Sequence, residues 1–117
     1  MNLLLIINDA PYGSEKAYNA LRLAMTLQKE HPDVKVRIFL LADAVICAVA
    51  EQSTPQGYYN IGRMLKSVIA KGGEVHACGS CMDARGLRTA RHIEEVAAST
   101  MSVMTQWTVE ADKVLTF

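Results

Sequence analysis

The most constraining feature of the sequence is segment 3–7, an unbroken run of leucine and isoleucine between Asn2 and the polar pair Asn8 and Asp9. A strand with one face in water alternates apolar and polar residues, whereas a continuous run is typical of a strand buried on both faces of a parallel sheet. A second, largely apolar run follows at 34–41. The chain is therefore predicted to build a sheet that is covered on both sides.

Helical and extended patterns alternate along the rest of the chain. Apolar residues recur at helical spacing over 17–27 and, most regularly, over 61–69, where Asn60 is the expected cap and the glycine pair 72–73 the expected stop. Further strands are expected at 73–77, at 112–117 and at 93–98, where a helix fits the pattern almost as well, and helices at 42–50 and 101–109. This order predicts a single α/β domain over residues 1–117. Its five-stranded, mostly parallel sheet would carry helices on both faces, in flavodoxin-like layers.

Composition excludes several classes of protein. Lys plus Arg and Asp plus Glu number 12 each, and this zero net charge argues against direct nucleic-acid binding. The longest apolar run, 44–50, is far shorter than the roughly 20 residues of a membrane-spanning helix, and no basic residue precedes the first run as in a signal peptide. Three cysteines are too few for a secreted disulfide scaffold, so we expect a cytoplasmic protein without a membrane partner.

The helix expected at 42–50 bears on assembly. No charged residue occurs in 44–50, so this helix would be apolar on every side and would need to be buried all round. A domain of this size has limited interior. We therefore expect a subunit interface to supply the missing cover.

Cys78 and Cys81 are the residues best suited to carry chemistry. They directly follow the third predicted strand, and the loops after parallel strands meet at the carboxyl edge of a sheet, where ligands bind. Asp43, after the second strand, is expected at the same edge. Three arginines at a spacing of three, from Arg85 to Arg91, would form a basic stripe if that segment were helical. Nearby positive charge favours the thiolate, which is the nucleophilic form of cysteine.

The residues alone leave four interpretations of the cysteine pair. A thioredoxin-like dithiol fits the spacing, but the aromatic residue before it and the proline after it are missing. A zinc site would have to recruit His76, His92 and Cys47 at irregular spacing. The other two are a single cysteine that carries sulfur as a persulfide, and two small residues packed at a tight turn without chemistry. No glycine-rich phosphate loop or hydrolase elbow occurs, and neither a cofactor nor a metal is expected.

Residues spread over the whole chain match the pattern of a known family. They are segments 8–15, 21–24, 39–40, 42–45, 57–58, 60–61 and 64–65, then Cys78, Cys81, Asp83, Arg85 and Gly86, and finally 106–108 with 111–117, which is the most specific stretch. On these residues the chain resembles the DsrE/DsrF-like family of small bacterial sulfur-relay proteins, and closely its YchN-type members. The resemblance implies a five-stranded α/β fold and ring-like homo-oligomers, as homotrimers or as homohexamers of stacked trimers.

The resemblance also implies a cysteine that accepts sulfane sulfur in the members that relay it. Cys78 matches that cysteine in position, and Asp43 and Arg85 match polar positions beside it. We therefore expect a persulfide carrier, or sulfurtransferase, that acts through Cys78 between donor and acceptor proteins. Cys81 is expected to resolve the persulfide or to close a reversible disulfide on Cys78. The alternative is a non-catalytic oligomeric protein that binds a small anion or metabolite in a cleft at the sheet edge.

Overall fold

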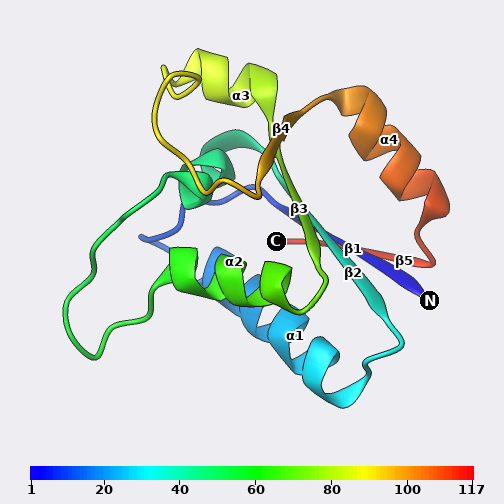
Figure 1. The fold of residues 1–117 in the computed structure, drawn as a ribbon. Coiled ribbons are helices and arrows are strands. Elements are labelled where there is room, and N and C mark those ends of the chain that lie inside the picture. Colours follow the sequence, from blue (N-terminus) through cyan, green and yellow to red (C-terminus); the bar gives the residue numbers. More distant parts are fainter.

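A five-stranded parallel sheet is the framework of the structure, a computed structural model that describes residues 1–117 (Figure 1). Its strands are β1 (Asn2–Ile7), β2 (Lys35–Leu40), β3 (Glu74–Cys78), β4 (Ala97–Ser99) and β5 (Lys113–Thr116), in the order β4-β3-β2-β1-β5. Every neighbouring pair is parallel. The prediction of a five-stranded α/β domain is confirmed, and the sheet is parallel throughout.

The helices divide between the two faces of the sheet. Helices α1 (Lys16–Glu30) and α2 (Ile61–Ala70) pack against each other on one face, and α4 (Met101–Glu110) lies on the other (Figure 1). Right-handed crossovers explain this division. The connections from β1 to β2 and from β2 to β3 step the same way, whereas the connection from β4 to β5 returns across the whole sheet. None of the helices is both long and apolar enough to cross a membrane.

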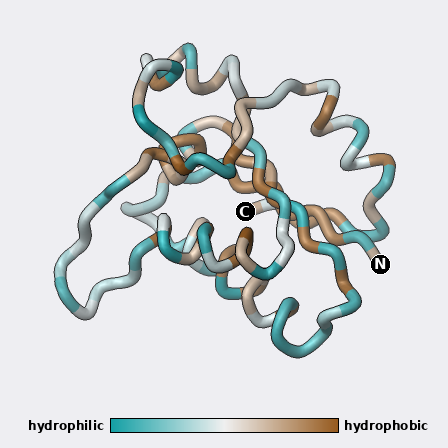
Figure 2. Tube along the Cα trace, viewed as in Figure 1, coloured by the Kyte–Doolittle hydropathy of each residue, from teal (hydrophilic) through white to brown (hydrophobic).

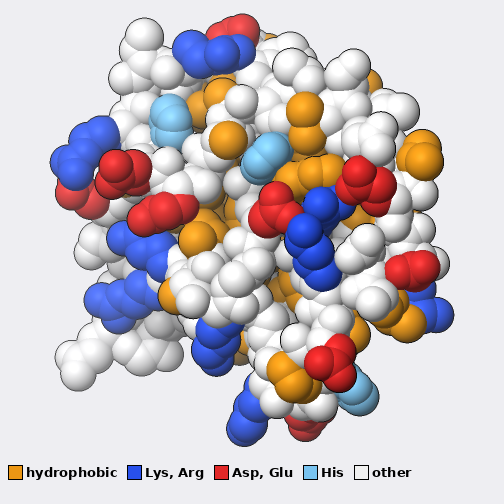
Figure 3. Space-filling view, turned by 45° about the vertical axis from the view of Figure 1, so that its right-hand side comes forward, with side chains coloured by type: hydrophobic (Ala, Val, Ile, Leu, Met, Phe, Trp, Pro, Cys, Tyr) orange, Lys and Arg blue, Asp and Glu red, His pale blue; other side chains and the backbone are white.

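The core follows the strand pattern expected from the sequence. Hydrophobic residues concentrate along the central strands (Figure 2), and β1 is buried from Leu3 to Ile7. On the face of α4, Trp107 packs edge-on against Phe39, with ring centroids 6.0 Å apart, and lies 4.3 Å from the His76 ring. Arg37 lies over the same indole and pairs with acidic residues of β3 and α4. Neighbouring charges of opposite sign are also visible on the surface in Figure 3.

Two segments differ from the expectation. The fourth strand is Ala97–Ser99 rather than 93–98. The apolar residues Ile93 and Val96 belong to a turn before this strand, and their side chains are buried without being part of the sheet. The backbone N–H of Ile93 donates to the carbonyl of Ala48, which pins that turn to a distant segment. The helix expected at 42–50 is the short 3-10 helix η1 (Ala42–Ala48).

Much of the apolar segment 44–50 is covered within a single chain, while Ile46, Val49 and Ala50 are only partly buried, and the expected subunit interface stays a prediction. Ala44, Val45, Cys47 and Ala48 are all buried within a single chain. The cover comes from α2, β3 and the short helix α3 (Gly79–Ala84), which all contact η1. The oligomeric state therefore also stays a prediction.

Candidate functional site

Cys78 occupies the junction between the sheet and a helix. It is the last residue of β3 and the N-cap of α3, so the sheet holds its backbone and the first turn of the helix surrounds its thiol. Its Sγ accepts a hydrogen bond from the backbone N–H of Cys81 at 3.4 Å, and it lies 3.2 Å from the hydroxyl of Ser80. Free N–H groups in the first turn of a helix stabilise negative charge at such a position.

The surroundings of the three cysteines shift their pKa values in different directions. Burial, with only 5% of Cys78 exposed, opposes ionisation, but hydrogen bonds from Cys81 and Ser80 outweigh it and lower the pKa of Cys78. For Cys81, burial and the hydrogen bond with Cys78 raise the pKa. Burial raises the pKa of Cys47 to about 12. Cys78 is therefore the cysteine that ionises most readily.

Cys81 is held from a second direction by the start of η1. The backbone N–H of Ala42 donates to Cys81 Sγ at 3.3 Å. Ala42 has a φ of 49°, a left-handed conformation that costs a non-glycine residue about 1–2 kcal/mol and that is characteristic of functional sites. The strained residue thus aims its N–H at the second thiol of the site.

Asp43 and Arg85 meet beside the two cysteines. Arg85 Nε lies 2.9 Å from Asp43 Oδ1, and Arg85 Nη1 donates to the carbonyl of Cys81 at 3.1 Å. The pair therefore joins η1 to the end of α3. The structure brings together all four residues expected at the site, while their chemical roles stay predictions.

The condition for a basic stripe from Arg85 to Arg91, a helix over that segment, is not met. Helix α3 ends at Ala84, and Gly86 follows in the left-handed conformation common after a helix end, with a φ of 66°. Arg85, Arg88 and Arg91 therefore turn to three different carboxylates instead of lining one face.

The sequence model of the DsrE/DsrF-like family matches residues 1–117. The chain belongs to this family. Protein YchN of Escherichia coli is 41% identical over 115 residues, which cover 98% of this chain and 97% of YchN. An uncharacterized protein of Methanocaldococcus jannaschii is also 41% identical, over 117 residues and all of both chains.

The fold comparison agrees with the sequence comparison. The crystal structure of the YchN protein from Escherichia coli superposes with a TM-score of 0.94 at 40% identity, over 99% of this chain and 98% of that one. A protein of unknown function from Methanobacterium thermoautotrophicum shares the fold at 13% identity, with a TM-score of 0.72 over 99% and 98% of the two chains. The predicted membership of the DsrE/DsrF-like family, close to YchN, is confirmed.

Two site residues of this DsrE/DsrF-like chain, Ser80 and Ala42, escaped the sequence analysis, and a third, Arg88, was considered only as part of a possible basic stripe. Ser80 was predictable, because it lies in the first helical turn after an N-cap thiol. Ala42 was not, since its left-handed conformation leaves no sign in the sequence. Arg88 lies against Gly79, where an added Cβ would come within 2.6 Å of its Nη2, and it pairs with Asp83 at 2.9 and 3.0 Å. Its position over the first turn of α3 depends on tertiary packing.

The histidines do not join the cysteines in a metal site. His76 Nδ1 lies 3.1 Å from Ser99 Oγ, and its ring packs against Trp107 in a tilted arrangement. Burial lowers the pKa of His76 and so disfavours protonation of the ring. His92 Nδ1 pairs instead with the carbonyl of Ala90. Across the whole chain, no three His, Cys, Asp or Glu side chains converge on one point.

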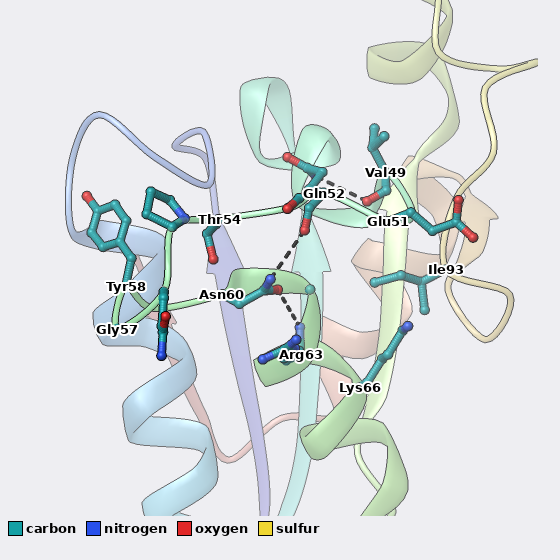
Figure 4. Close-up of a pocket in the computed structure, with 14 residues that line it drawn as sticks. Val49, Glu51, Gln52, Thr54, Gly57, Tyr58, Asn60, Arg63, Lys66 and Ile93 are labelled. Atoms are coloured by element: carbon teal, nitrogen blue, oxygen red, sulfur yellow. Dashed lines mark hydrogen bonds between the residues drawn. The ribbon is translucent and has the colours of Figure 1, made fainter.

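A separate polar cleft lies between the loop 49–60 and helix α2 (Figure 4). Its volume is about 650 Å³, and none of its lining residues is a cysteine. Asn60 caps α2 by accepting from the backbone N–H of Arg63 at 3.0 Å, as expected, and its amide donates to the carbonyl of Gln52 at 3.2 Å. Arg63 and Lys66 line the cleft, and neither forms an ion pair.

Proposed function

We propose that this DsrE/DsrF-like protein carries sulfane sulfur as a persulfide on Cys78 and passes it to an acceptor protein. The observation that carries the proposal is the Cys78 thiol, which caps α3 and has a lowered pKa because Cys81 and Ser80 donate to it. A nucleophile needs a fixed position and a stabilised anion. The end of β3 supplies the position, and the first turn of α3 supplies the donors.

Loading is a transfer between two sulfur atoms. The Cys78 thiolate attacks the terminal sulfur of a donor persulfide, a bond forms between that sulfur and Cys78 Sγ, and the donor leaves as a thiolate. The donors that stabilise the Cys78 thiolate, Cys81 N–H and Ser80 Oγ–H, also suit the anionic persulfide. Arg85 and Asp43 stand beside Cys81 and are the proposed contacts of the incoming donor group.

The proposed assembly is a homotrimer or homohexamer that works with sulfur donor and acceptor proteins. Support comes from apolar side chains left uncovered on the last helix and strand. Val109 of α4 is 77% exposed, and Val114 and Leu115 of the edge strand β5 are 40% and 39% exposed. Uncovered apolar edge strands are typical of surfaces that meet another chain. The three cysteines are all free thiols, which supports the reducing cytoplasm as the proposed cellular compartment.

Intact-mass spectrometry tests the proposal directly. The purified chain is incubated with a cysteine desulfurase and cysteine, and its mass is measured before and after a reductant. We expect the wild type to gain one sulfur atom that the reductant removes, Cys78→Ser to gain none, and Cys47→Ala to load like the wild type. A wild type that never gains sulfur, or a Cys78→Ser variant that loads equally well, refutes the carrier function.

The cleft of Figure 4 favours a second candidate, the binding of a small anion. Arg63 and Lys66 lie three residues apart on α2, line the cleft and have no acidic partner. Calorimetric titration with inorganic phosphate tests it, with Arg63→Gln as the variant that should lose binding and Lys71→Gln, outside the lining, as its control. The pH dependence of cysteine alkylation distinguishes the two functions. Rapid alkylation of one cysteine at low pH favours the carrier, and slow alkylation of all three cysteines favours the binding protein.

A further inference from the structure

We infer that Cys81 confers a second activity on the loaded site: without an acceptor, the protein releases the carried sulfur as hydrosulfide and closes a Cys78–Cys81 disulfide. The inference rests on the proposed persulfide at Cys78 and deepens that function. It joins the two roles expected for Cys81, resolution of a persulfide and formation of a reversible disulfide, in a single reaction.

The geometry of α3 brings the two sulfur atoms within reach. Cys78 is the N-cap and Cys81 lies one turn later, with its backbone N–H on Cys78 Sγ at 3.4 Å. Residues one helical turn apart fall within the Cα separation of roughly 4.4–6.8 Å that a disulfide accepts. Cys47, the third cysteine, is 1% exposed inside the core and takes no part.

The discharge step balances without an outside oxidant. The Cys81 thiolate, its proton lost to solvent, attacks Sγ of the persulfidated Cys78. The Cys78–Cys81 disulfide bond forms, the bond from Sγ to the sulfane sulfur breaks, and that sulfur leaves with the electron pair as hydrosulfide. The sulfane sulfur is reduced, and the two cysteine sulfurs are oxidised by the same two electrons. A dithiol reductant then returns the site to its starting state.

The resting structure holds this step back. Burial and the hydrogen bond with Cys78 raise the pKa of Cys81, whereas the hydrogen-bond donors around Cys78 lower the pKa of that thiol, so ionisation of Cys78 is favoured over ionisation of Cys81. Other charged groups around Cys81 are Arg85 after α3 and Asp43 on η1, which pair with each other. Because attack needs the Cys81 thiolate, release should accelerate as pH rises. An acceptor protein therefore has time to take the sulfur before it is lost.

The first experiment follows the fate of the sulfur. The full chain is loaded with inorganic polysulfide, desalted, and assayed for free sulfide and for intact mass. We expect the wild type to release sulfide and to end lighter than the reduced chain by two hydrogen atoms. Cys81→Ser and Cys81→Ala should keep the sulfur and lose the release, whereas Cys47→Ala should behave like the wild type. Release by both Cys81 variants at the wild-type rate, or release without the disulfide, overturns the inference.

A second experiment separates this inference from the carrier function. The reduced chain receives one equivalent of dithiodipyridine, which forms a mixed disulfide on Cys78 and releases one thiopyridone. We expect the wild type to release a second thiopyridone as Cys81 closes the internal disulfide, and Cys81→Ser to stop after the first. A wild type that also stops there refutes the attack by Cys81, whatever the chain does with sulfur. A wild type that releases the second thiopyridone but never loads sulfur refutes the carrier function, and sulfide release with it.

Discussion

Replacing Ser80 by alanine tests the link between the start of α3 and the acidity of Cys78. The Ser80 hydroxyl lies 3.2 Å from Cys78 Sγ and is one of the donors that lower the pKa of Cys78. A hydrogen bond to a charged group contributes roughly 1.5–3 kcal/mol, and we take the lower end because Ser80 is exposed and water partly replaces it. This energy corresponds to about a tenfold change in the population of the thiolate.

The sign follows from which form of Cys78 is stabilised. Ser80→Ala removes a donor to the thiolate, so the pKa of Cys78 rises and its reactivity profile moves to higher pH. On the acidic side of the profile, where little thiol is ionised, alkylation should slow by about a factor of ten. Above the thiol pKa, where Cys78 is fully ionised in both chains, the rates should converge.

The assay is iodoacetamide alkylation of Cys78 at a series of pH values, followed by peptide mass spectrometry. Ser102→Ala, an exposed serine on α4, is the matched control and should keep the wild-type profile. A Ser80→Ala profile that coincides with the wild type, or that moves to lower pH, would contradict the assignment of Ser80 as a donor. In that case the backbone N–H of Cys81 would be left to account for the lowered pKa.

Three further outcomes follow from the packing. Trp107→Ala should cost about 3–5 kcal/mol in urea unfolding monitored by circular dichroism, because the indole is buried. Ser102→Ala, at an exposed position on the same helix, should stay within about 0.5 kcal/mol, and an equal loss in both variants would contradict the role of the buried indole. Arg85→Gln breaks a partly exposed ion pair, so it should lower the free energy of unfolding by less than about 1 kcal/mol in the same assay. The same variant should slow persulfide loading, whereas Arg91→Gln should load like the wild type. Normal loading of Arg85→Gln would exclude Arg85 from the site. Val114→Asp on edge strand β5 should lower the mass found by light scattering relative to the wild type, and an unchanged mass would exclude β5 from the proposed subunit contact.

Local patterns were enough to predict most of the fold. Continuous apolar runs identified β1 and β2, and helical spacing with Asn60 as cap identified α2, because both patterns directly reflect which side chains are buried. The segment around β4 was misplaced for the same reason. Ile93 and Val96 are buried, but they are buried from a turn held by a distant carbonyl. A pattern of burial does not report which backbone conformation produces it.

Some features of the candidate site were predictable from the sequence, and others depend on tertiary contacts. The sequence by itself determined that Cys78 ends a strand and that Asp43 and Arg85 lie near its edge, because parallel strands bring their carboxyl ends together. Only the tertiary structure decided that Arg85 pairs with Asp43, that Ala42 in a left-handed conformation donates to Cys81, and that three regularly spaced arginines diverge. Those contacts arise where η1 packs on α3, and their partners are separated by long stretches of chain. Regular spacing reports only the residues that one helix would align, and the helix here ends before the arginines begin.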